Sequence, residues 1–151
     1  IQALDLMGRK ITFDRDGLLD VLAEEVRVFV QSEKAGVFAA EVGQLGQALD
    51  ALLETAHGVR ARQESNPHEV GAAAVPFLDM MALVLYAWMW LRMMRVAQDA
   101  VQADSPEKAF YQAKLDSGRF FLSRLLPRYR ALAEEIRAGS AVLMAMDADA
   151  F

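Results

Sequence analysis

Cysteine is absent from this 151-residue sequence, and histidine occurs only twice. The lack of cysteine excludes disulfides, thiolate metal sites and a thiol nucleophile, and it leaves the redox compartment open. His57 and His68 both fall near expected helix ends, and no serine stands in a nucleophile-elbow setting, so no catalytic triad can be drawn. A glycine-rich phosphate loop is also missing. We therefore expect this chain to catalyse no reaction by itself.

A concentrated basic stripe is missing as well. The 16 Lys and Arg residues are outnumbered by 21 Asp and Glu residues, which gives a net charge of -5, and both signs are spread along the chain. Binding to a phosphate backbone needs clustered positive charge, so we expect no nucleic-acid partner. The N-terminus lacks the basic-then-apolar layout of a signal peptide, and a cytoplasmic location is the default expectation.

No segment alternates with the period of a strand, and no linker rich in Pro, Gly or Ser divides the chain. Apolar residues instead recur at helical spacing over four long stretches. The best of these stripes steps by four and three residues and comprises Phe38, Val42, Leu45, Leu49, Leu52, Ala56 and Val59. Short connections between the stretches predict an all-α, antiparallel up-and-down four-helix bundle, preceded by a short N-terminal helical stub that ends at Gly8.

Several helix boundaries have their own signals. Asn66, Pro67 and Glu69 predict a helix start with a capping box, and this helix is expected to run to about Ala103 with a bend at Pro76. A second cap-plus-proline pair opens the last long helix, whose stripe continues past a kink to a glycine end. The residues concerned are Ser105, Pro106, Pro127 and Gly139, and a short turn and a loose terminus are expected from Ser140 to Phe151.

The 22 residues from Val70 to Leu91 contain a single charge, Asp79. Such a segment is long enough to span a bilayer, but Asp79, Pro76 and the amphipathic flanking helices favour a helix buried in the bundle. Its large side chains point in nearly every direction, so three neighbours cannot cover all of them, and we predict contact with a second domain or subunit. These side chains are Met80, Leu83, Tyr86, Trp88, Met89 and Trp90.

Two polar features on the helices are candidates for a catalytic or metal site. Asp79 is a candidate proton-handling carboxylate, but an ion pair with Lys114 or Arg119 is the favoured interpretation, because burial of a lone charge is costly. Glu54 and His57 have the Glu-x-x-His spacing of carboxylate-bridged metal sites. That site needs a second such pair, and Ser65 stands three residues before His68, so no metal is expected.

Four segments resemble the C-terminal end of bacterial acyl-CoA dehydrogenases. They are "IQALDLMGRK", "LYAWMWLRMMRVA", "FYQAKLDSGRFFLSRLLPRYRAL" and "EEIRAGSAVLMAMDADAF". The similarity is to the long subgroup that includes the 3-methylmercaptopropionyl-CoA dehydrogenases, which carry an additional helical domain. It covers nearly the whole chain, and the first and third segments are its most specific parts.

The resemblance implies that catalysis belongs to another part of the parent enzyme. In these flavoenzymes a catalytic glutamate and FAD oxidise the acyl-CoA, and that glutamate lies just upstream of the Ile-Gln pair with which this chain begins. The resemblance therefore implies a fragment, with residues 1–13 as the end of the last catalytic-domain helix and its connector, and 14–151 as an appended bundle. Only Ile1 and Gln2 fall near the flavin motif, and neither Asp5 nor Glu24 replaces the missing base. FAD is expected in the parent enzyme and not in this fragment.

Two functional hypotheses follow. The first is a structural module of an FAD-dependent acyl-CoA dehydrogenase, in contact with the parent catalytic domain and with other subunits of a homo-oligomer, while the parent dehydrogenates its acyl-CoA substrate in fatty acid metabolism. The alternative is a non-enzymatic binding module that docks on a membrane surface or an acyl chain through its aromatic and Met-rich helix.

Overall fold

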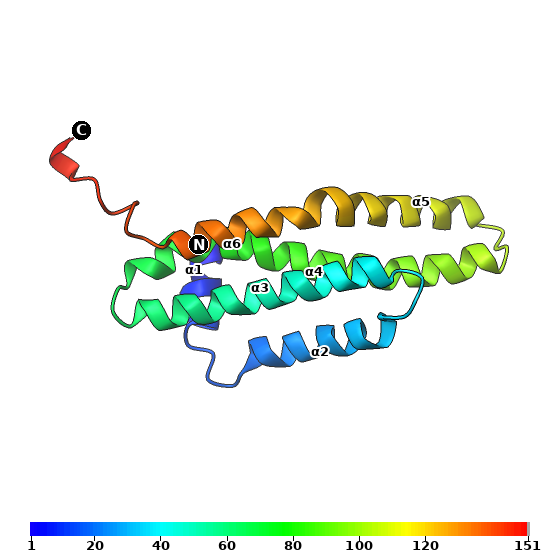
Figure 1. Ribbon diagram of the computed structural model, residues 1–151, viewed down its shortest axis with the longest axis horizontal. Coiled ribbons are helices and arrows are strands. Elements are labelled where there is room, and N and C mark those ends of the chain that lie inside the picture. The colour runs from blue at the N-terminus through cyan, green and yellow to red at the C-terminus, as the bar shows by residue number, and fades with distance from the viewer. Residues whose placement is uncertain (151) are drawn as a thin grey trace.

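A computed structural model describes residues 1–150 and shows an all-α fold (Figure 1). Five helices pack together behind a short N-terminal helix, and the described residues include no strand, as predicted. The elements in chain order are α1 (Gln2–Asp5), the π-helical segment η1 (Leu6–Ile11), α2 (Leu18–Glu33), α3 (Ala39–Gln63), α4 (His68–Gln102), α5 (Lys108–Phe120), the π-helical η2 (Phe121–Leu125), the 3-10 segment η3 (Leu126–Arg128), α6 (Tyr129–Ala138) and the 3-10 turn η4 (Ala148–Ala150).

The N-terminal stub continues beyond Gly8, where the sequence predicted its end. The helical segment runs to Ile11 in π geometry and ends where the hydroxyl of Thr12 donates to the carbonyl of Met7. Gly8 is needed for a different reason, because a Cβ there would lie 3.1 Å from Val70 Cγ1 on α4. The stub therefore packs closely against α4 and places Met7 in the common core.

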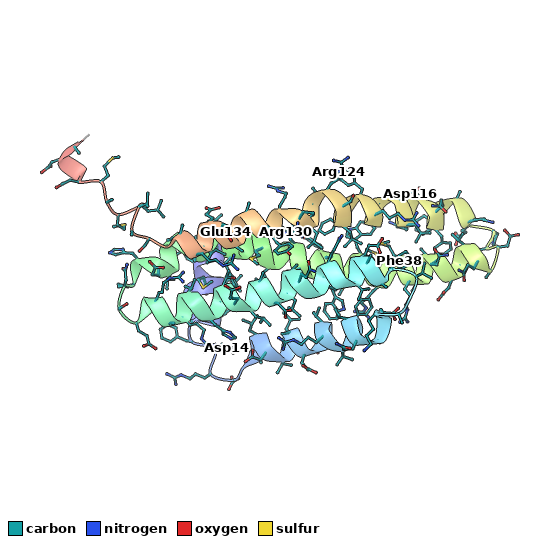
Figure 2. The ribbon with its side chains drawn as sticks, in the orientation of Figure 1. Asp14, Phe38, Asp116, Arg124, Arg130 and Glu134 are labelled. Atoms are coloured by element: carbon teal, nitrogen blue, oxygen red, sulfur yellow. The ribbon has the colours of Figure 1, made fainter. Side chains whose placement is uncertain are left out.

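A connector leads from the stub to α2 and is fixed by Asp14 (Figure 2). The Asp14 carboxylate accepts hydrogen bonds from the backbone N–H groups of Leu18 and Leu19, each at 2.9 Å. These bonds, that to Leu19 first, hold the pKa of Asp14 below its ordinary value. The bonds satisfy two of the free N–H groups of the first turn, so α2 starts here and runs back along α3.

Helix α3 buries its predicted stripe completely. All seven residues from Phe38 to Val59 that the spacing selected are buried, and α3 packs against α2, α4 and α6. Helix α4 lies at the centre of the fold and contacts α1, η1, α3, α5 and α6. By length and composition α4 could cross a bilayer, a test that the core helix of a globular protein also passes, and 39% of its apolar window is buried.

The last rod runs antiparallel to α4 from α5 to α6 (Figure 1). It continues through Pro127 as predicted, but its departure from α geometry already begins at Phe121, where η2 widens the turn before η3 tightens it. Pro127 lacks an N–H group and so removes one backbone hydrogen bond from the rod, next to the π and 3-10 segments. Gly139 ends α6 with φ +70°, the left-handed value that favours glycine.

The tail after Ser140 leaves the bundle and extends away from it (Figure 1). It contains the expected turn directly after Ser140, whereas the 3-10 turn η4 lies where a loose terminus was expected, and Phe151 lies outside the described residues. Nothing in the fold tests the predicted division at residues 13 and 14, which stays a prediction.

Candidate functional site

An exposed strip, apolar or aromatic except for Asp79, runs along the outer face of α4. It steps by four and three residues through Val75, Asp79, Ala82, Tyr86, Met89, Met93 and Val96, and we call these seven residues the outer strip. Six of them are exposed and Ala82 is half-buried, with Tyr86 60% and Val96 59% exposed. The opposite face of the same helix buries Phe77, Met80, Val84 and Leu91 in the core.

The strip confirms that the other described parts of the chain do not cover all sides of α4. Of the six large side chains named from the sequence, Met80 is buried, Tyr86 and Met89 are exposed, and Leu83, Trp88 and Trp90 are half-buried. Exposed apolar patches of this extent usually mark interfaces. The identity of the covering partner remains a prediction.

The C-terminal half of the strip forms the floor of an open groove of about 940 Å³. Phe29 of α2 forms part of one wall, and Phe110, Tyr111 and Lys114 of α5 form the other. The floor consists of α4 residues, including Met89, Met93 and Val96. Methionine side chains adapt their shape readily, so this floor suits an apolar side chain of a binding partner better than a rigid small molecule.

Three cations line this groove, and they are held in different ways. Arg95 is engaged, because its Nη1 lies 2.6 Å from Glu33 Oε1, and this hydrogen bond raises the pKa of Arg95 above its ordinary value. Arg92 instead stacks 5.4 Å from the Trp88 ring, and Lys114 lies 5.2 Å from the Phe110 ring. Within residues 1–150 neither has a carboxylate in salt-bridge distance. The groove therefore combines an apolar floor with two cations whose charge is not neutralised.

A buried polar cluster occupies the opposite end of α4. Glu69 is 6% exposed, and its Oε1 accepts hydrogen bonds from Ser140 N at 2.8 Å and Ser140 Oγ at 2.7 Å. Its Oε2 accepts from Arg62 Nε at 2.7 Å, and Arg62 Nη2 also donates to the carbonyl of Ile136 at 3.0 Å. Asn66 Nδ2 donates to Ser140 Oγ at 2.9 Å. We call these residues, Glu69, Arg62, Asn66 and Ser140, the clasp.

The clasp keeps Glu69 ionised. The hydrogen bond from the Ser140 hydroxyl, then those from Arg62 and the Ser140 amide, lower the pKa of Glu69 to about 2 despite its burial. A carboxylate with this pKa exchanges no proton near neutral pH, so it acts as an anchor between the start of α4 and the end of α6. Gly139 permits the approach, because a Cβ there would lie 3.1 Å from both carboxylate oxygens.

The clasp corrects one detail of the predicted helix start, the capping box. Glu69 does not complete a capping box, since its carboxylate is bound to Ser140 and Arg62, and the N–H of Asn66 donates to the carbonyl of Arg62. Asn66 Oδ1 does accept from the N–H of His68 at 3.1 Å. Sequence reasoning missed the clasp because its partner residue follows 71 positions later; the Gly139-Ser140 pair after a helix end was the available signal.

The predicted ion pair of Asp79 is wrong. Asp79 is exposed on the outer strip, and within residues 1–150 no basic group lies in salt-bridge distance of it. Arg119 contacts Asp116 at 3.4 Å and Lys114 lies over Phe110. An exposed carboxylate needs no partner, because water solvates it.

The remaining residues named from the sequence are spread over the surface. Glu54 is bound by Arg137, with distances of 3.1 Å to Nε and 2.8 Å to Nη2, which lowers the pKa of Glu54, while His57 and His68 are exposed. Within the described residues no three potential metal ligands come together. Ile1 and Gln2 are exposed at the start of α1, and neither lines the groove.

Together these observations define an all-α bundle domain with a fixed polar anchor at one end of its central helix and an open apolar groove near the other. The model of the acetyl-CoA dehydrogenase C-terminal-like family matches residues 22–147. The chain belongs to this family. No curated protein matches the chain in a sequence search.

Proposed function

We propose that this chain is the C-terminal helical domain of an FAD-dependent acyl-CoA dehydrogenase of the 3-methylmercaptopropionyl-CoA subgroup, and that it serves as a contact module. The family match over residues 22–147 carries the proposal. The oxidation of the acyl-CoA belongs to the parent enzyme, whose catalytic base would lie upstream of Ile1. The outer strip of α4 supports the contact role, because most of it is exposed and all of it except Asp79 is apolar or aromatic.

The residues present do not fit a flavin on their own. Ile1 and Gln2 offer one alkyl group and one amide, both exposed on a four-residue helix, and they do not enclose a planar ring system. The chain therefore takes no part in the chemical step. Its contribution is to position and stabilise the parent enzyme.

A direct test compares the chain with its parent. The purified chain, mixed with FAD and a series of acyl-CoA thioesters, should retain no flavin absorbance after gel filtration and should reduce no electron-accepting dye. The parent should do both. Flavin retained by the isolated chain, or a parent that oxidises no acyl-CoA, would refute the proposal.

The second candidate function is docking on a lipid surface, which the Met-rich floor of the groove and its cations favour. Flotation with vesicles that contain anionic lipid separates the two candidates. A contact module should remain at the bottom of the gradient, whereas a docking module should float, and Arg92→Glu with Lys114→Glu should then abolish flotation.

A further inference from the structure

The tail beyond the clasp combines an apolar segment with acidic residues. Val142, Leu143, Met144 and Met146 are each more than half exposed, from 57% for Met144 to 80% for Val142, and Asp147 and Asp149 follow them. Large apolar side chains in a row remain exposed to water only at a cost, which docking on another apolar surface removes. The tail therefore has the composition of a docking segment.

The groove on α4 has the complementary composition. Its floor is apolar, and Arg92 and Lys114 are the two lining cations without an anionic partner among the described residues. Asp147 and Asp149 would supply two negative charges to these two positive ones. Charge complementarity of this kind determines which partner binds and in which register.

The apolar part of the tail, up to Met146, cannot reach the groove of its own chain. The clasp fixes Ser140 beside Glu69, and Met89 and Val96 lie 20 and 27 residues further along α4, roughly 30–40 Å away at the helical rise. The six residues that follow Ser140, up to Met146, span at most roughly 20 Å when fully extended. In Figure 1 the tail leaves at one end of the molecule and the turn from α4 to α5 lies at the other.

We propose that residues 141–149 of one copy dock in the α4 groove of a second copy. The apolar residues of the tail would lie on Met89, Met93 and Val96, and the two aspartates would face Arg92 and Lys114. Two bundles side by side in antiparallel orientation place each tail beside the other groove, so a twofold axis closes the pair with both grooves filled. The inference rests on the contact role proposed for α4, and it does not depend on flavin chemistry.

Cross-linking tests the contact. Because the chain has no native cysteine, only the introduced thiols can react. The full chain with Met144→Cys is mixed with the full chain with Val96→Cys and treated with a short thiol-to-thiol crosslinker. A covalent heterodimer is expected. The matched control replaces Val96→Cys by Val28→Cys on α2, which is exposed to the same degree, 60% against 59%, and should give none. Equal yields with both partners would overturn the proposal.

Charge reversal tests the register. Asp147→Lys with Asp149→Lys gives a tail-reversed chain, and Arg92→Glu with Lys114→Glu gives a groove-reversed chain. Each alone should raise the dimer dissociation constant at least about tenfold, because attractive pairs become repulsive, whereas their mixture should restore association, since every tail then meets a groove of opposite charge. Sedimentation velocity over a concentration series measures this.

A control with the same charge change as groove reversal, Arg124→Glu with Arg128→Glu, should leave dimerisation unchanged, and Arg124 points away from the bundle in Figure 2. A wild-type chain that stays monomeric over the whole series, or a mixture that does not associate, would overturn the inference. The flavin test on the parent would be unaffected by either result.

Discussion

The two ends of α4 differ in whether their side chains find partners within the chain. At the first turn, the buried Glu69 carboxylate is saturated by donors from Ser140 and Arg62. Toward the last turns, Met89, Met93 and Val96 stay exposed, and two lining cations lie over aromatic rings with no carboxylate in salt-bridge distance within residues 1–150. One end is complete within a single chain, and the other presents a surface on which a partner can gain buried area.

This difference separates a rigid part of the fold, the clasp, from a part suited to binding a partner, the groove. A saturated ionic cluster fixes geometry, because any displacement breaks several bonds at once. An apolar groove with methionines fixes little by itself and gains free energy only when it is covered. Because the clasp holds the root of the tail, the same molecule presents a docking segment at its fixed end and a docking surface at its open end.

The largest expected effect comes from two adjacent methionines. Met94 is fully buried and Met93 is 41% exposed. In the monomer, at a concentration below the dimer dissociation constant, Met94→Ala should lower the free energy of unfolding by about 2–5 kcal/mol through lost burial and a residual cavity, and Met93→Ala should change it by less than about 0.5 kcal/mol. Urea unfolding followed by circular dichroism measures both. Similar losses for the two variants would mean that the outer strip is covered within the chain.

The clasp should give the next largest effect. Glu69→Ala leaves the amide and hydroxyl of Ser140 without an acceptor, so we expect a loss of about 3 kcal/mol in the free energy of unfolding, below the full cost for a buried pair because Arg62 keeps access to water. Glu54→Ala is the matched control, since its pair with Arg137 is exposed, and it should cost less than about 1 kcal/mol. Equal costs would show that the clasp contributes no more than a surface pair.

The pH dependence of the free energy of unfolding should reveal the contribution of Glu69. Its pKa falls from an ordinary 4.5 to about 2 on folding, so the unfolded chain binds the proton more tightly. The stabilisation is complete above pH 4.5 and is lost as the pH falls toward 2, by about 3 kcal/mol in total. Glu69→Gln should flatten the acid limb of a stability profile over this window. Parallel profiles for the variant and the wild type would assign the acid sensitivity to other carboxylates.

Much of the fold was predictable because its signals are local. The stripe from Phe38 to Val59 needs only its own spacing to show which face is buried, and Gly139 marks a helix end by its conformational preference alone. The end of the stub was wrong for a related reason. Glycine is typical of a helix end, but the small size of Gly8 serves the contact with Val70, which no neighbouring residue in the sequence reveals.

The candidate site was predictable only in outline. An uncovered strip follows from the excess of apolar side chains on one helix, so its existence needed no tertiary information. The groove depends on the rotation of α5 about its axis, which turns Phe110 outward beside Tyr111, and the clasp depends on a contact between residues 71 positions apart. The ion pair of Asp79 was predicted wrongly for another reason. The apolar composition of its helix favours a buried charge, but Asp79 lies on the exposed outer strip.

The smallest predicted effect concerns two glycines whose surroundings differ. Gly118 on α5 is buried against α4, and a Cβ there would lie 2.6 Å from Met94 Cγ, whereas Gly71 on α4 has nothing within 4 Å of that position. Alanine is the better helix former by about 1 kcal/mol, so Gly71→Ala should stabilise the chain by about that amount. Gly118→Ala should destabilise it by about 1 kcal/mol net, because the cost of moving buried Met94 exceeds the gain in propensity. Thermal unfolding of the two variants should therefore shift in opposite directions, and an upward shift for Gly118→Ala would show that α5 can move off the groove floor without loss.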